Sequence, residues 1–331
     1  MNRAMNRSTA TAARHRCAII LRGVLLAILL PWMAACSHHA DTTPAAPENP
    51  YLVSSRSLAE NGLAALRRER WAAAEQAFQQ SLQAAELADD MPQVIVAWYR
   101  LGVLYRAMQR PQAAKTAYAE SLRLAEAEQQ PVMAMRAHLA LLLLAATSEP
   151  TATADSEKLP DSLYNAPAWP LDIHLQAARL AQLRGDMTRA QRAYQMVIAA
   201  QSDTAADATA IAPLQARAQL GLAELARQRG QQSQAKQAAE AALTICHRIG
   251  EPRIAAHAHL LLAELAPDGS AMAIQGRQRA LRIYRSLHDM RAEQRLLTQL
   301  LAQPGGALDA AQRQAYQLRL QQINAQQGAA Q

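Results

Sequence analysis

Histidine, cysteine and glutamate side chains are the residues of this 331-residue chain with which acid–base, nucleophilic or metal chemistry would be expected. His257 and His259 are two residues apart in a helical pattern, which places them about 200° apart around a helix. Side chains that face opposite ways cannot jointly hold a metal ion. Cys246 lies in the apolar pattern ALTICHRI, which favours a buried thiol over a nucleophile. Glu224 and Glu264 occupy equivalent places in two copies of LAELA, so repetition accounts for them without catalysis.

Motifs for catalysis are missing from the sequence. It holds no Gly-x-Ser-x-Gly segment, no glycine-rich phosphate loop, no His-Glu-x-x-His and no closely spaced cysteine pair. His38 and His39 could bind a metal, but they lie in a polar segment that we expect to be solvated. We therefore expect a protein that is not an enzyme, with no catalytic residue, no metal site, no cofactor and no small-molecule substrate.

The first 36 residues show a targeting pattern. Four arginines precede an apolar run, Cys17 to Leu30, that only Arg22 interrupts, and Met33-Ala34-Ala35-Cys36 follows. The segment resembles a bacterial lipoprotein signal peptide over residues 1–35, which implies that Cys36 becomes the lipid-bearing (palmitate) first residue of the mature chain. An ordinary cleaved signal and an uncleaved anchor are the alternatives. Residues 36–50, rich in Pro, Ala, Ser and Thr, predict a flexible tether.

The expected location of the protein in the cell follows from the same resemblance. Ser37, and not Asp, follows the cysteine, which by similarity to enterobacterial sorting implies a lipid anchor in the outer membrane, facing the periplasm. Because the protein would hold no disulfide, with Cys246 its one remaining thiol, we expect packing alone to stabilise it. No run of 18 uninterrupted apolar residues follows, so contact with the membrane is expected through the lipid only.

The net charge of +7 belongs mainly to the targeting segment. The chain has 34 basic and 27 acidic residues; residues 1–35 hold five of the arginines and no acidic residue, which leaves 29 against 27, a net of +2. A nucleic-acid partner therefore loses its electrostatic basis.

The element on which the rest of the chain is built is the stretch Ile95 to Ser121, IVAWYRLGVLYRAMQRPQAAKTAYAES. As two helices, it alternates large and small side chains: Trp98, Leu101, Gly102 and Tyr105 on the first helix, and Ala114, Tyr118 and Ser121 on the second. Forty residues earlier the same pattern holds Gly62, Ala74, Phe78 and Ser81. The segment resembles a tetratricopeptide repeat. This implies an all-α fold, a right-handed α-solenoid of helix pairs whose period of about 40 exceeds the family's usual 34 through longer helices.

The repeats fall into two blocks. We expect an N-terminal block at 51–146, a linker loop at 147–170, a C-terminal block at 171–302 and a capping helix at 307–325. The second block keeps the small and aromatic positions and turn glycines at Ala178, Gly185, Ala190, Tyr194, Ala223, Gly230 and Ala235, and a polar connection spans about Gln201 to Ala210. The loop holds four prolines. Tyr164 and Trp169 are expected to anchor it against a helix, and simple disorder is the alternative.

Binding residues are implied by the family's concave groove, which the first helices line. In the register set by Gly102, the groove positions include Arg56, Tyr99, Arg106, Arg179, Gln182, Arg217, Leu220, Glu224, Arg227 and His257. Basic residues outnumber acidic ones in this set, so an extended peptide with carboxylates would complement it. The alternative is an arginine-rich helix surface with no ligand.

The resulting hypothesis is a lipid-anchored scaffold or adaptor that binds another envelope protein during assembly of a pilus, secretion or export complex. It resembles the tetratricopeptide-repeat lipoproteins with such roles. The alternative is a regulator that activates a cell-wall enzyme such as a peptidoglycan synthase or a protease.

Overall fold

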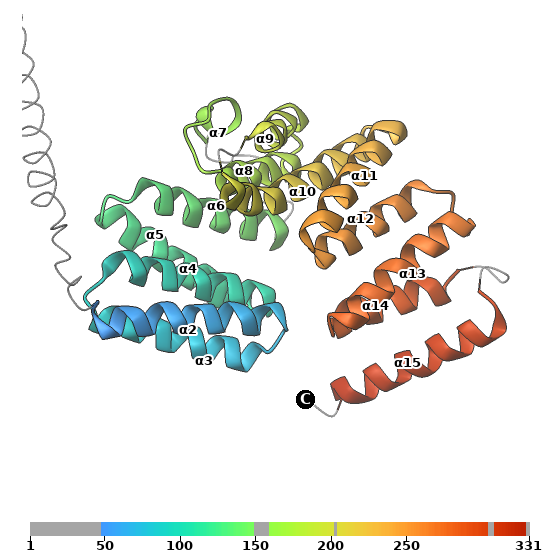
Figure 1. Ribbon diagram of the computed structural model, residues 1–331, viewed down its shortest axis with the longest axis horizontal. Coiled ribbons are helices and arrows are strands. Elements are labelled where there is room, and N and C mark those ends of the chain that lie inside the picture. Colours follow the sequence, from blue (N-terminus) through green and yellow to red (C-terminus); the bar gives the residue numbers. More distant parts are fainter. Residues whose placement is uncertain (1–47, 149–158, 202–203, 304–307, 329–331) are drawn as a thin grey trace, which may run out of the picture. The chain divides into compact units, whose positions relative to one another are not determined.

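The Ala-, Leu-, Gln- and Arg-rich sequence forms helices throughout the part of the chain that the structure, a computed structural model, describes: residues 48–148, 159–201, 204–303 and 308–328. All described helices belong to one compact unit that begins at Pro50. They are α2 (Pro50–Arg67), α3 (Trp71–Leu87), α4 (Met91–Ala107), α5 (Pro111–Ala127), α6 (Pro131–Ser148), α7 (Ser162–Asn165), α8 (Leu171–Leu183), α9 (Met187–Ala199), α10 (Ala205–Gln228), α11 (Gln232–Ile249), α12 (Pro252–Leu265), α13 (Ala271–Ser286), α14 (Met290–Leu301) and α15 (Ala310–Gly328) (Figure 1). No strand occurs in these ranges, so the all-α prediction is confirmed. The predicted signal peptide, Cys36 and most of the predicted tether lie outside the described residues.

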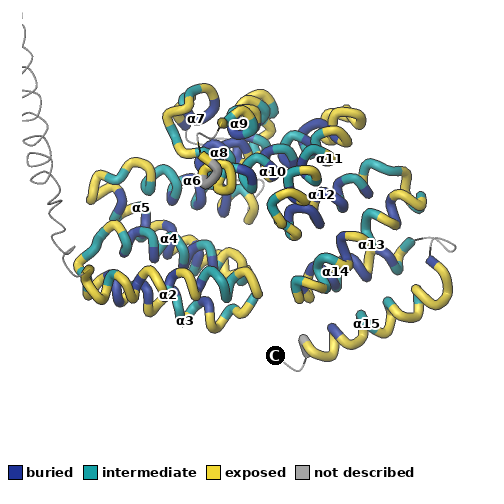
Figure 2. The backbone as a smooth tube through the Cα atoms, viewed as in Figure 1, coloured by how far each residue is buried: buried dark blue, intermediate teal, exposed yellow. Residues whose placement is uncertain are grey.

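Consecutive helices pair and stack, as the solenoid prediction requires. Helix α2 packs against α3, α4 against α5, α8 against α9, α10 against α11 and α12 against α13, and each pair also contacts the next helix along the chain. The first helices of successive pairs also touch: α4 contacts α6, α8 contacts α10, and α10 contacts α12. Residues that are buried and residues that are exposed alternate along each helix, as expected for helices with one side against a neighbour (Figure 2). The core is therefore a row of small clusters, which is how a solenoid is stabilised.

The period of 40 has a simple geometric origin in the first block. Helices α3, α4 and α5 each have 17 residues, and three-residue turns separate them. Each turn contains one residue with a left-handed backbone: Glu69, Asp89, Gln109 and Gln129, spaced 20 apart, with φ between 52° and 59°. The amide after it donates back across the turn, as Arg110 does to the carbonyl of Tyr105 at 2.9 Å, which is the bond of a Schellman cap. The longer helices, not longer turns, therefore account for the extra residues.

Aromatic side chains of the second helices lie against glycines of the first helices. A Cβ atom at Gly62 would lie 2.5 Å from the Phe78 ring, and one at Gly102 would lie 2.5 Å from the Tyr118 ring. Phe78 and Tyr118 are both fully buried. The alternation of large and small residues in the sequence predicts close contact between the two helices at Gly102 and Ala114. Ala114 is buried too, but it packs with Tyr118 and with residues of α6, so the close contact of Gly102 is made by the aromatic ring.

Buried serines connect the two helices of each early pair. Ser81 Oγ donates to the carbonyl oxygen of Ser55 at 2.8 Å, and Ser121 Oγ donates to that of Ile95 at 2.9 Å. Both pairs are 26 residues apart and lie at equivalent repeat positions. The recurrence of serine at 40-residue spacing thus reflects a buried side-chain-to-backbone hydrogen bond that satisfies both groups.

The segment between the two blocks packs against the helices that follow. Leu159, Leu163 and Tyr164 are buried in the cluster that α8 and α9 share with α6. Trp169 packs at its edge and donates from Nε1 to Ser162 Oγ at 3.2 Å. His174 Nδ1 lies 2.8 Å from the carbonyl oxygen of Leu163 and fixes the short helix α7. Residues 159–170 therefore agree with the anchored interpretation; residues 149–158 lie outside the described part.

Helix α6 is long and apolar enough to cross a membrane by length and composition, with a mean hydropathy of 1.4. It packs against α5 and directly against α8, with Ala137, Leu139, Ala140 and Leu143 buried. Since 28% of this apolar stretch is buried, packing within the solenoid accounts for part of its apolar sequence.

One predicted connection is wrong. The sequence suggests a polar link from Gln201 to Ala210, but α10 begins at Ala205. Thr204 caps it: its Oγ1 accepts from the amide of Asp207 at 3.1 Å and donates to that residue's carboxylate at 2.6 Å. Alanine-rich sequence behind a threonine cap favours helix over loop, even with Pro213 inside it.

The C-terminal helices are held by a nearly buried carboxylate. Glu293 on α14 is 1% exposed and accepts from Arg285 Nε of α13 at 2.7 Å. It also accepts two bonds from Arg319 of α15, at 2.9 and 3.0 Å. The last helix is thereby fixed to the stack by paired charges as well as by Ile323.

Candidate functional site: a basic groove lined by the first helices

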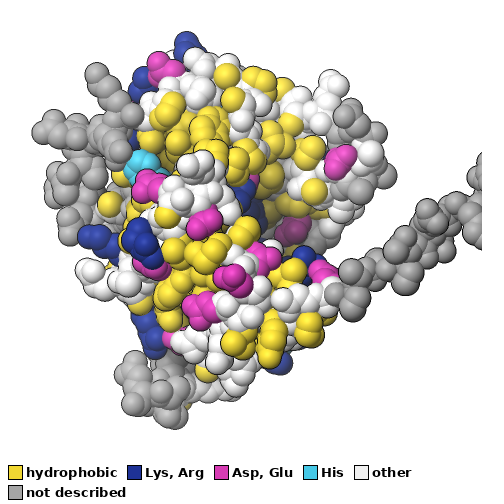
Figure 3. Space-filling model, turned by 90° about the vertical axis from the view of Figure 1, so that its left-hand side faces the viewer, with side chains coloured by type: hydrophobic (Ala, Val, Ile, Leu, Met, Phe, Trp, Pro, Cys, Tyr) yellow, Lys and Arg dark blue, Asp and Glu magenta, His cyan; other side chains and the backbone are white. Residues whose placement is uncertain are grey.

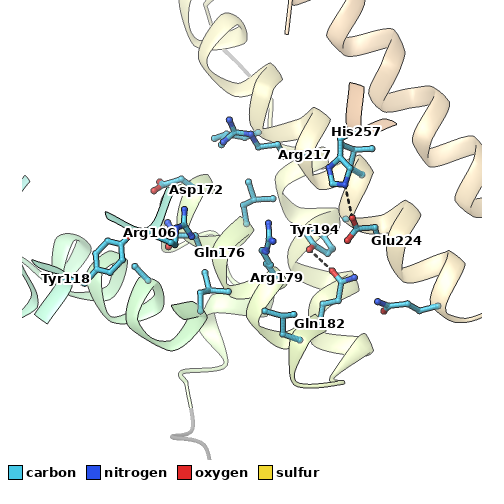
Figure 4. A pocket seen from close by; sticks show the side chains of 18 of the residues that line it. Arg106, Tyr118, Asp172, Gln176, Arg179, Gln182, Tyr194, Arg217, Glu224 and His257 are labelled. Atoms are coloured by element: carbon cyan, nitrogen blue, oxygen red, sulfur yellow. Dashed lines mark hydrogen bonds and ion pairs between the residues drawn. The ribbon is translucent and has the colours of Figure 1, made fainter. Parts of the chain in front are cut away.

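A cavity of about 510 Å³ runs along the first helices of successive pairs. Its walls come from α4, α6, α8, α10 and α12, and Tyr118 and Tyr194 reach it from the second helices α5 and α9 (Figure 4). We call this cavity the basic groove.

The groove collects eight of the ten positions chosen from the sequence: Tyr99, Arg106, Arg179, Gln182, Arg217, Leu220, Glu224 and His257. Two positions lie elsewhere. Arg56 is exposed on α2. Arg227 is exposed on α10, where its Nε lies 3.8 Å from Glu264 of α12. Neither residue is among those that line the cavity, and no residue of α2 is. A binding role for any of these residues stays a prediction.

Several lining residues were not chosen from the sequence. Asp172 and Leu175 lie on α8 at the register that the other repeats use, so the same counting from Ala178 would have found them. Tyr118 and Tyr194 were assigned to the repeat signature alone. Their rings fill the gaps between helices, and they also line the groove. A pattern that reports packing cannot show that one side chain serves both surfaces.

Tyrosine side chains form part of the groove wall. The rings of Tyr99 and Tyr118 are 5.5 Å apart between centroids, tilted by 51°. Burial raises the pKa of Tyr118 and of Tyr194 well above the usual value, so both phenols stay protonated. Tyr194 donates to Gln182 Oε1 at 2.9 Å (Figure 4). The buried Tyr118 hydroxyl has no hydrogen-bond partner among the described residues.

Three arginines give the groove its charge. Arg106, Arg179 and Arg217 are exposed on α4, α8 and α10, and none forms an ion pair with a carboxylate in the described part of the chain. The two lining carboxylates are both engaged. Asp172 binds Arg136, and Glu224 Oε1 lies 3.5 Å from His257 Nε2. The groove therefore presents three guanidinium groups that form no ion pair with the described carboxylates, and guanidinium groups are the donors best suited to carboxylate or phosphate.

An apolar cavity of about 290 Å³ adjoins the basic groove and shares Tyr99 and Asp172 with it. Leu63 and Leu66 of α2, Val96 and Val103 of α4, and Met133 of α6 form much of its lining. The guanidinium of Arg136 binds both oxygens of Asp172, at 2.7 and 3.0 Å. That ion pair stands where the two cavities meet and neutralises the charge there. A ligand spanning both would need an apolar group next to acidic ones.

A cavity of different character lies among α3, α4 and α5. Acidic Glu86, Asp89 and Glu120 surround Met91, Val94, Trp98 and Leu124, in a volume of about 390 Å³. Figure 3 looks onto the side where α3 ends and α4 begins, and it shows hydrophobic side chains with acidic ones among them. This acidic lining would not attract an acidic segment, in contrast to the lining of the basic groove.

Metal-binding residues do not cluster in the described ranges. No three His, Cys, Asp or Glu side chains come together there in a way that could hold a metal ion. Cys246 is buried, and burial raises the pKa of its thiol to about 11, which opposes nucleophilic use. His259 is also mostly buried, in agreement with a packing role.

Stacked helix pairs with an arginine-lined cavity along their first helices define the protein as an α-solenoid with a basic groove. Residues 54–127 match the family model described as tetratricopeptide repeat. The protein therefore contains tetratricopeptide repeats, which typically serve as non-catalytic scaffolds that bind proteins. A solved structure, that of BtubC (BKLC) from P. vanneervenii, is 16% identical, and the match covers 85% of this chain and 93% of that chain with a TM-score of 0.40. No curated protein matches the sequence.

Proposed function

We propose that the protein is a lipid-anchored adaptor of the bacterial envelope, facing the periplasm, whose groove binds an acidic segment of a partner protein during assembly of an envelope complex. The observation that carries the binding part is the set of three unpaired arginines, Arg106, Arg179 and Arg217, along one cavity. Guanidinium groups without carboxylate partners favour a ligand that supplies carboxylates.

The adjoining apolar cavity refines the chemistry of that ligand. A segment that places one large apolar side chain between Leu66, Val103 and Met133, and acidic side chains beside Arg106 and Arg179, would match both cavities. An extended chain covers about 3.3 Å per residue, so a short stretch of sequence is enough to carry both features. Protein partners fit this arrangement because tetratricopeptide repeats generally bind proteins.

Photo-crosslinking in cells tests the groove whatever the identity of the partner. A photoreactive amino acid replaces Leu175, which lines the groove, and in a matched control it replaces the exposed Gln80 of α3. The proposal expects a discrete protein adduct from position 175 that position 80 does not give. Equal adducts from the two positions, or none from position 175, would count against the groove as the binding surface.

The anchor rests on the segment around Cys36 and has its own test. Cys36→Ala should leave a full-length precursor without lipid, because the substituted side chain offers no thiol for acylation. Radioactive palmitate and intact mass, measured on the wild type and the variant, give the readout; Cys246→Ala serves as control. If Cys36→Ala matures to the same mass and floats with membranes, the lipoprotein assignment is wrong.

A further inference from the structure

Arg253, the second residue of α12, contacts the turn between α2 and α3. Its Nη1 donates to Asp289 Oδ2 at 2.6 Å and to Glu69 Oε1 at 3.4 Å. Its Nη2 donates to the carbonyl oxygen of Arg67 at 3.3 Å, across 186 residues of sequence. One guanidinium thus joins the end of α2, the start of α12 and the start of α14. We call Arg253, Glu69, Asp289 and the Arg67 carbonyl the Arg253 latch.

The position of Arg253 is not explained by the stability of its own helix. A cation in the first turn of α12 faces the positive end of the helix dipole, where acidic side chains are favoured. The groups that Arg253 contacts are acceptors that favour a cation. Asp289 is 6% exposed and its other oxygen caps α14 by accepting from the amide of Ala292 at 2.9 Å. Arg67 is the last residue of α2, where backbone carbonyls lack partners within the helix.

The latch joins segments that are adjacent in sequence to the linings of both cavities. Leu66, next to Arg67, lines the apolar cavity, whereas His257, one turn after Arg253, lines the basic groove. Helices α2 and α3 do not themselves pack against α12 or α14 in the described part of the chain. The junction therefore depends on turn residues and side chains, which a small rearrangement can separate.

We propose that the Arg253 latch is a gate on the groove: closed, it holds the first helix pair near α12 and restricts access, and open, it admits the partner segment. What the gate admits rests on the proposed function, but its opening and closing do not. An acidic segment carries the same chemical group as Glu69. It can therefore compete for Arg253 and open the latch as it arrives.

Hydrogen exchange of the purified full chain tests whether the latch holds the junction. In Arg253→Gln, amides of the α2–α3 turn and of the start of α14 should exchange several-fold faster than in the wild type. The control is Arg123→Gln, which removes an exposed ion pair with Glu120 and should change neither segment. Unchanged exchange in Arg253→Gln would overturn the proposal.

A second variant separates the latch from the fold. Glu69 has a left-handed backbone, φ 56°, so Glu69→Gly removes the carboxylate while making the turn easier to form. Gln109→Gly makes the same kind of change in another such turn, with φ 59° and no latch contact, and is the matched control.

Access to the groove is then measured directly. The variant Gln176→Cys places a thiol in the groove lining, and its rate of reaction is compared for a small maleimide and a polymer-linked maleimide. Peptide mapping identifies the modified site. Arg253→Gln and Glu69→Gly should accelerate the polymer-linked reaction several-fold and leave the small reagent nearly unaffected, whereas Gln109→Gly should change neither. Equal polymer-linked rates in all variants would overturn the gate. This experiment needs no partner protein. If the proposed function fails but the gate exists, the variants will change the polymer-linked rate while position 175 gives no protein adduct.

Discussion

The ring of Tyr118 lies directly against the backbone of Gly102: a Cβ atom at Gly102 would be 2.5 Å from Tyr118 Cδ1. Real side chains do not approach so closely, so any larger residue at 102 must displace a fully buried ring. Gly102→Ala should therefore destabilise the protein by about 1–3 kcal/mol, the usual cost of overpacking. Chemical denaturation of the wild type and the variant measures it.

The clash with Tyr118 makes a more specific prediction. In a Tyr118→Ala background the added methyl group meets no ring, so Gly102→Ala should cost little or should stabilise the helix. A cost that is the same in both backgrounds would show that Tyr118 is not what restricts position 102.

Turn residues with a left-handed backbone offer a gain in stability. Gln109 has φ 59°, which costs a residue with a Cβ atom roughly 1–2 kcal/mol relative to glycine. The greater freedom of glycine in the unfolded chain offsets part of the free energy gained by removing this strain. Gln109→Gly should therefore stabilise the protein by about 0.5–1 kcal/mol. Gly185→Ala, at φ 80°, should act in the opposite direction. Thermal unfolding distinguishes the two, and a loss of stability in Gln109→Gly would contradict the reasoning.

Much of the fold could be predicted because repetition multiplies weak signals. Gly62 and Phe78 alone say little, but their recurrence at Gly102 and Tyr118 fixes the helix pair and its register. That register points Tyr99, Arg106, Arg179 and five further positions toward the concave side, so that eight of the ten chosen residues line one cavity.

Contacts between distant helices could not be predicted in the same way. The latch joins residues 69 and 253, and no periodic pattern relates an arginine on one helix to a turn 184 residues earlier. The start of α10 was missed because polar, alanine-rich sequence suits both a loop and a capped helix. In the sequence, Glu293 has the surroundings of an exposed polar residue. It becomes a buried, paired carboxylate because the fold places Arg285 and Arg319 beside it, and no sequence pattern shows that placement.

Glu293 predicts a dependence of the last helix on pH. Burial alone would raise the pKa of its carboxyl, but hydrogen bonds from Arg319 and Arg285 outweigh burial and hold the pKa below the usual 4.5. The stabilisation is therefore complete above the unfolded value and is lost as the pH falls through the lower, folded value. Helix α15 should become susceptible to proteolysis in acid before the rest of the described unit unfolds.

Glu293→Gln should reproduce this effect at neutral pH, at a cost of roughly 1–3 kcal/mol for the weakened charged hydrogen bonds. Limited proteolysis of residues 308–328 is the measurement, and Glu240→Gln, which affects an exposed pair with Lys236, is the control. Protection of α15 that does not change with pH or with either variant would mean that packing around Ile323 alone holds it.

The central claim is that the three unpaired arginines bind an acidic segment of a partner. The most direct test is the crosslinking yield from position 175 in the double variant Arg106→Glu with Arg179→Glu, against the control Lys115→Glu with Arg123→Glu on the exposed side of α5. Both pairs change the net charge equally, so any difference reports position. We predict that the groove pair abolishes the adduct, with circular dichroism unchanged, and that the control pair leaves its yield intact. An adduct that survives charge reversal in the groove would contradict the account.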